Sequence, residues 1–210
     1  MLRAIISSFI FGLMFVLLGQ SVWAASPVTS VFTLFPNPKF KYCLQVGSVP
    51  ATAQVTVTQN ELNDDLAITV QHVKPNLAFD LFTVQNTNLL SNGTVNPNFT
   101  TFGLAWYQSD IQADSFGNAL TVIRSIFVNQ IFGFDAGTTP PLPPTHTFHV
   151  GFWFNSPAEA APCGFTGTTP FNGTQNAGPN AMISVPNATT GLGPLCLNPN
   201  TSTTPATCHE

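Results

Sequence analysis

The chain has 210 residues, of which only 7% are charged, and its formal net charge at pH 7 is −4. Asn, Thr, Ser and Gln are abundant instead, so solubility must come from neutral polar groups. With five basic residues against nine acidic ones, neither a nucleic acid nor an anionic membrane surface is expected as a partner.

The N-terminus has the pattern of an export signal. A short basic start at Arg3 precedes an almost wholly apolar stretch from Ala4 to Leu18, which has the length of a signal-peptide core. A membrane-spanning helix needs roughly 20 apolar residues, and Gln20 interrupts the run before the small residue Ala24. We predict a signal peptide over 1–24 and a protein that is secreted or held in the cell envelope. The alternative is an uncleaved anchor, in which case this segment alone would contact a membrane.

The number and the positions of the cysteines are consistent with an exported protein. Their number is even, and all four follow the predicted signal: Cys43, Cys163, Cys196 and Cys208. In an exported chain this predicts two disulfides. Of the three pairings we favour Cys163 with Cys196 and Cys43 with Cys208, because the first closes a Gly/Pro-rich segment and the second ties the C-terminus to the start of the domain. A zinc site is not expected, since no two cysteines have the close spacing of zinc ligands.

The first part of the mature chain has the alternation of β-strands. From Thr52 to Thr58 apolar residues alternate with polar ones, and the same period returns at 66–71 after the polar stretch 60–65. These two strands are expected to form a hairpin. A turn at 74–76 then leads into a third strand from Leu77, which would extend the hairpin into a meander.

Further strands are predicted in the second part. The stretches 102–109 and 119–128 flank a turn in which Gly117 can adopt positive φ, and we expect them to pair as a hairpin. A Pro-rich connection over 133–144 leads to a strand over 145–154, and the apolar run 181–185 is expected to add an edge strand. In the strand over 145–154, alternation predicts a core face with Phe148, Val150, Phe152 and Phe154. The opposite face would carry His149, Gly151 and Trp153.

The only clear helix start is Ser156-Pro157-Ala158-Glu159, a capping-box sequence with Pro at the first helical position. Pro162 limits that helix to a short one. We therefore predict a single all-β domain over 25–210, an antiparallel β-sandwich or barrel of about seven strands. It would have one short helix and a loop-rich, disulfide-stapled C-terminal segment from about residue 155.

No motif for catalysis, a cofactor or a metal stands out. His146 and His149 lie three residues apart on a predicted strand, so their rings would face opposite sides of the sheet. The turn 110–118 has oxygen ligands but lacks the spacing of a calcium loop. Carboxylates are too sparse to mark the pair that glycoside hydrolysis needs. We expect no cofactor and no metal, and we favour a protein that is not an enzyme.

Three blocks resemble sequences of secreted bacterial proteins of unassigned activity: 102–110 (FGLAWYQSD), 148–155 (FHVGFWFN) and 190–196 (TGLGPLC). The stretch 73–81 (VKPNLAFDL) is similar to a strand-turn-strand motif of many extracellular sandwich modules. The resemblance implies an extracellular β-sandwich-like domain and carries over no functional residue.

Three functions remain as hypotheses. The leading one is a secreted or cell-surface, non-enzymatic module with a structural, adhesive or ligand-binding role. The second is a carbohydrate-binding module in which an exposed Trp153, beside His149, stacks on a sugar. The competing interpretation is that the Pro-rich segment before this strand, or the loop from Cys163 to Cys196 after it, folds over Trp153 and buries it. The third is a secreted hydrolase whose site comes from distant residues. An extracellular glycan or an envelope protein is the expected partner.

Overall fold

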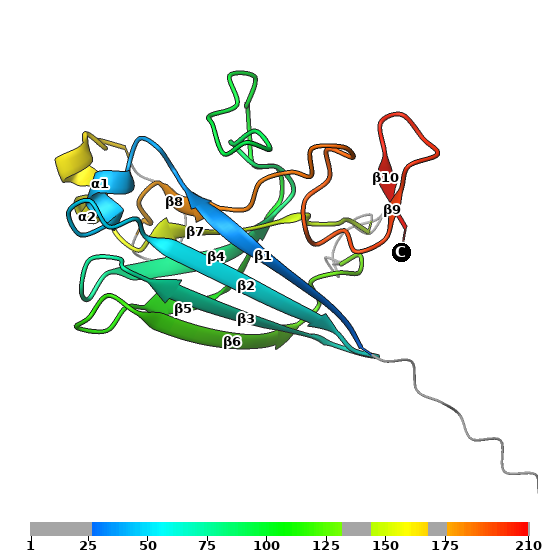
Figure 1. Ribbon diagram of the computed structural model, residues 1–210, viewed down its shortest axis with the longest axis horizontal. Helices are drawn as coiled ribbons and strands as arrows, with labels where there is room; N and C mark the ends of the chain where they lie inside the picture. Colours follow the sequence, from blue (N-terminus) through cyan, green and yellow to red (C-terminus); the bar gives the residue numbers. More distant parts are fainter. Residues whose placement is uncertain (1–26, 132–143, 168–175, 210) are drawn as a thin grey trace, which may run out of the picture.

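The computed structural model describes residues 27–131, 144–167 and 176–209. The predicted signal peptide and all but the last residue of the Pro-rich connection lie outside the described residues. Eight strands form one antiparallel sheet in the order β5-β4-β7-β8-β1-β2-β3-β6, and this sheet folds over into two layers (Figure 1). The predicted all-β architecture is confirmed. No helix among the described residues is long and apolar enough to cross a membrane.

We call four strands the front layer: β1 (Val28–Pro36), β2 (Thr52–Gln59), β3 (Asp64–Gln71) and β6 (Ala119–Ser125). The predicted hairpin of β2 and β3 is confirmed, with Val55 opposite Ile68. Val55, Val57, Leu66 and Ile68 are fully buried, whereas the residues between them are more exposed. The alternation in the sequence therefore corresponds to one buried and one more exposed face of this hairpin.

The back layer contains β5 (Ala105–Gln112), β4 (Ala78–Val84), β7 (His149–Phe154) and β8 (Asn180–Ile183). The end of β1 joins the two layers, because Phe35 and Pro36 pair with Ile183 and Met182 of β8. Between the layers lies the main core, in which Phe79 stacks against Phe152 and Phe154 at ring centroid distances of 4.7 and 5.7 Å.

Two predicted strand pairings and one predicted strand position are wrong. The strands β5 and β6 do not pair with each other: β5 pairs with β4, and β6 with β3. Likewise β3 and β4 belong to different layers, so there is no meander. The turn at 114–118 crosses from one layer to the other, and Gly117, at φ 78°, packs so closely that a Cβ would collide with the Val73 carbonyl. Finally, β8 lies between β7 and β1 and is not an edge strand.

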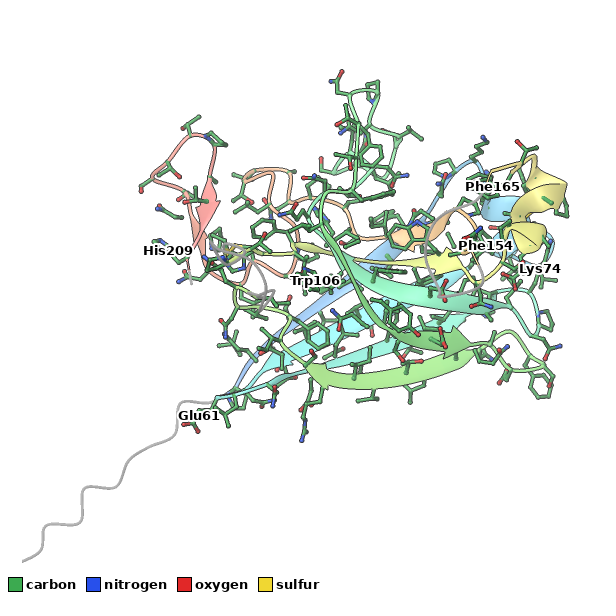
Figure 2. All side chains as sticks on the ribbon, turned by 180° about the vertical axis from the view of Figure 1, so that it is seen from behind. Glu61, Lys74, Trp106, Phe154, Phe165 and His209 are labelled. Atoms are coloured by element: carbon green, nitrogen blue, oxygen red, sulfur yellow. A yellow bond between two sulfur atoms is a disulfide. The ribbon has the colours of Figure 1, made fainter. Side chains whose placement is uncertain are left out.

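The short helices close one end of the sandwich. The helix α2 (Pro157–Ala160) has the predicted capping box: Ser156 Oγ accepts from Ala158 N at 3.2 Å, and Glu159 Oε2 accepts from Ser156 N at 3.1 Å. It runs into a 3₁₀ turn, η1 (Ala161–Cys163), and packs near α1 (Lys41–Leu44). Figure 2 shows Phe154 and Phe165 at this end of the molecule, with Glu61 and His209 at the opposite end.

All four cysteines form disulfides, as predicted, but the favoured pairing is wrong. Cys43 pairs with Cys163, and Cys196 pairs with Cys208. The first bond joins α1 to η1, which follow strands of different layers. The second becomes short-range because β9 (Pro199–Asn200) and β10 (Thr207–Cys208) form a small hairpin that returns the chain to Cys196.

Candidate functional site

Other segments of the chain cover the outer face of the back layer over β7 and β8, whereas Tyr107 and Asp110 of β5 on that face are exposed. Trp153 is only 2% exposed and lies in a second apolar cluster with Phe82, Val84 and Ile183. Its indole makes edge contacts with Phe82 and Phe102, at centroid distances of 5.3 and 5.0 Å.

The exposed platform proposed for Trp153 is therefore wrong, because the residue is buried. Ala177 and Val185, from the loop between Cys163 and Cys196 that was expected to cover it, belong to its cluster, but so does Phe102 of the β4–β5 connection, which was not expected there.

The covering segment is the long connection from β4 to β5, residues 85–104, which we call the cover loop. Its two ends pair through Asn86 N and Phe102 O at 2.9 Å and Gln85 N and Leu104 O at 3.1 Å. Further along, Asn96 N donates to Asn88 O at 2.9 Å. Figure 1 shows this green segment rising above the sandwich. Long loops fixed by their own hydrogen bonds often carry binding functions.

A pocket of about 480 Å³ lies between the cover loop, the segment 186–193 and the start of β7. Amide and hydroxyl side chains make up much of its wall, and two phenylalanine rings add apolar surface. The lining includes Gln85, Asn86, Thr87, Asn96, Asn98, Phe99, Thr101, Phe148 and His149. No Asp, Glu, Lys or Arg is among the residues that line this pocket.

His149 contributes to the pocket but is only 3% exposed. Its Nδ1 lies 3.0 Å from Ser184 Oγ, which also accepts a hydrogen bond from Val150 N at 3.2 Å. Burial lowers the pKa of His149 to about 4, because desolvation disfavours the charged ring; the contact with Ser184 opposes this only partly. The imidazole is therefore neutral at pH 7. The expectation that His149 sits on an open polar face is wrong.

The pair of His149 and Ser184 does not form a nucleophilic site. Ser184 is 1% exposed, and its oxygen is already occupied by the Val150 amide. Attack on a substrate would need an accessible hydroxyl that the histidine can deprotonate. The two side chains instead join β7 to the end of β8, under the pocket.

A carboxyl pair lies on the same outer face, outside the pocket. Asp80 of β4 is opposite Asp110 of β5, and both Asp80 oxygens are buried with no donor among the described residues. Desolvation, then the hydrogen bond and charge of Asp110, then the charge of Glu159, raise the pKa of Asp80 to about 7. Burial and the neighbouring carboxyls therefore favour the protonated form of Asp80.

An irregularity in β5 creates this pair. The β4–β5 register shifts between Leu81 and Phe82, which leaves Gln108 as an extra residue. The shift brings Tyr107 and Asp110 to one side of the strand, where Tyr107 Oη donates to Asp110 Oδ1 at 2.9 Å. Partial burial and Asp110 raise the pKa of Tyr107 to about 12.

The remaining candidate groups are placed as follows. Among the described residues, no three His, Cys, Asp or Glu side chains gather in a way that could hold a metal. Asp114, in the stretch considered for calcium, accepts from the backbone of Phe116 and Asn118 at 2.8 and 2.9 Å and so shapes its own turn. His146 stacks on Phe148 at 5.2 Å instead of joining His149.

The sequence did not predict most of the residues that line this pocket. They come from two irregular segments, 85–101 and 186–193, with no spacing motif. The one available signal was the density of Asn and Thr around Phe99 in an unusually long connection. Compared with known proteins, the chain matches no family model, no curated protein and no solved structure.

Proposed function

We propose that this protein is an exported, non-catalytic binding module, and that the pocket under the cover loop takes a neutral, polyhydroxylated ligand such as a segment of a glycan. The observation that carries the proposal is the composition of the pocket wall. Amides and hydroxyls supply both donors and acceptors, and two aromatic rings supply flat apolar surface.

The electrostatics favour an uncharged ligand. The pocket has no charged lining residue, and its one titratable group, His149, is neutral at pH 7. A charged ligand would lose its hydration there without an opposite charge to compensate. A sugar keeps its hydrogen bonds by exchanging water for the amides of residues such as Asn98.

Export is part of the proposal. Two disulfides agree with an oxidising compartment, and the predicted signal peptide supplies the route. A surface whose polarity rests on neutral groups suits contact with uncharged polymers outside the cell.

The test is a glycan-array screen of the protein, followed by calorimetry with the best ligand. We expect binding that is unchanged by added salt, because no charges pair. Replacing Phe99, a ring in the pocket wall, by Ala is expected to weaken binding about tenfold. Phe116→Ala is the matched control, since Phe116 is 82% exposed in the turn at 114–118, outside the pocket.

Two results would argue against the proposal. One is an array on which no neutral glycan binds. The other is a ligand that Phe99→Ala and Phe116→Ala bind equally well, which would place the binding surface elsewhere.

A further inference from the structure

Among the described residues, one edge of β1 has no neighbouring strand over most of its length. β1 pairs with β2 from Val28 to Leu34, but on its other side it pairs with β8 only at Phe35 and Pro36. In the part of the chain that the structure describes, no third strand pairs with β1. The stretch 28–34 therefore presents a free edge about 20 Å long.

The direction of the unpaired groups follows from one hydrogen bond. Asn37 N donates to Ala181 O at 2.8 Å, in register with the pair of Phe35 and Ile183. Backbone groups along a strand point alternately to its two sides. The N–H and C=O of Thr29 and Val31 therefore point away from β2, into the space beside the free edge.

The chain after β8 leaves this edge because of its sequence. Ser184 still bonds to β7, its N–H reaching Val150 O at 2.8 Å, but Pro186 has no N–H to donate to a sheet. From there the segment 187–199 turns outward, and Figure 1 shows it separating from β1, which continues as a long arrow. A groove of about 500 Å³ lies between them.

The walls of the groove define what it can accept. Residues 28–32 form one wall and the segment from Val185 to Pro199 the other, with Phe32, Leu192 and Leu197 among the apolar groups. No charged residue lines it. Because a second wall stands opposite the edge, we expect the groove to accept a single extended chain more readily than the edge of another folded sheet.

We propose that this groove binds an extended, uncharged peptide segment of another protein, which adds as a strand to β1. Its backbone exchanges hydrogen bonds with Thr29 and Val31, which line the groove, and alternate apolar side chains pack against Phe32 and Leu197. This inference is independent of the glycan pocket.

The test uses a phage-displayed library of random peptides, selected on the wild-type protein. The deciding variant is Val31→Pro, which removes an N–H that points into the groove and leaves the hydrogen bonds to β2 in place. Val31→Thr is the matched control, because it keeps the N–H and a β-branched side chain. Selected peptides are expected to bind wild type and Val31→Thr alike and Val31→Pro about tenfold more weakly.

A second measurement does not depend on any variant. Amide exchange of the wild-type protein is followed by NMR, without and with a selected peptide. We expect the amides of Thr29 and Val31 to exchange fast when free and to become protected when bound. The amides of Ser30 and Phe32, which face β2, are expected to be protected in both states.

The proposal is wrong if no selected peptide distinguishes Val31→Pro from Val31→Thr, or if the Thr29 and Val31 amides stay unprotected in the complex. It is also wrong if the protein alone dimerises and Val31→Pro makes it monomeric, because a second copy would then occupy the edge.

Discussion

The two outer faces of the sandwich differ in what covers them. On the front layer Val31, Leu120 and Val122 are 57%, 68% and 65% exposed, so the strands lie open to solvent. On the back layer Trp153 and His149 are 2% and 3% exposed under the cover loop and the segment 176–193. The same β-alternation therefore has two meanings: on the front layer it separates core from solvent, and on the back layer it separates two buried clusters.

This difference locates the candidate site. Covering a sheet face with loops creates a second apolar cluster, and the polar pocket forms where those loops stop fitting closely together. In the described part of the chain no loop covers Leu120 and Val122 on the front face, which stay exposed. We expect ligand chemistry on the covered face, and three perturbations test that division.

The largest effect is expected from the disulfide that joins the ends of the two layers. Replacing Cys43 and Cys163 by Ala removes a cross-link between residues 120 apart, which is expected to lower the free energy of unfolding by about 5 kcal/mol. Removing Cys196–Cys208, with a separation of 12, is expected to lower it by about 3 kcal/mol. Chemical denaturation of the two double variants compares them. Equal losses would mean that chain restriction is not the main contribution.

The next largest effect on the free energy of unfolding is expected from replacing one residue on each outer face. Trp153→Ala is expected to lower the free energy of unfolding by about 3 to 5 kcal/mol, because it empties the centre of the second cluster. Val122→Ala, on the open face, is expected to change it by less than about 0.5 kcal/mol. Urea denaturation of both variants is the measurement. A small loss for Trp153→Ala would show that the covered face is not packed.

The smallest effect concerns the carboxyl pair. Folded Asp80 keeps its proton up to about pH 7, whereas the unfolded chain loses it near 3.8, so this residue makes stability fall as pH rises from about 4 to 7. Asp80→Asn removes that dependence. The variant is expected to match wild type at pH 4 and to exceed it by about 1 to 2 kcal/mol at pH 8, less than the full shift because Asp110 and Tyr107 beside it are exposed.

Urea denaturation across this pH range provides the comparison. Asp110→Asn serves as a second variant, because it removes the neighbouring charge and is expected to flatten the same slope. If the difference between Asp80→Asn and wild type does not change with pH, Asp80 does not hold a proton in the folded protein.

Local patterns predicted local structure well. The hairpin of β2 and β3 and the capping box at Ser156 and Glu159 depend on neighbouring residues, and both are confirmed. β1 was missed because its pattern is mixed: Val31 is exposed and Ser30 is half-buried, which obscures the period of two.

Contacts between distant segments were not predictable in the same way. The turn at 114–118 has the residues of a hairpin, but the chain crosses between layers there, and local turn chemistry does not distinguish the two outcomes. The cysteine pairing depends on which strands bring the sulfurs together. The burial of Trp153 and His149 depends on a loop whose own sequence contains no strand or helix pattern.

The most direct test of the division between the two outer faces is amide hydrogen exchange of the protein with and without its best array ligand. We predict slower exchange in the cover loop and in the segment 186–193, with no change in β2, β3 and β6. Protection confined to the strands of the front layer, with the cover loop unchanged, would contradict the account.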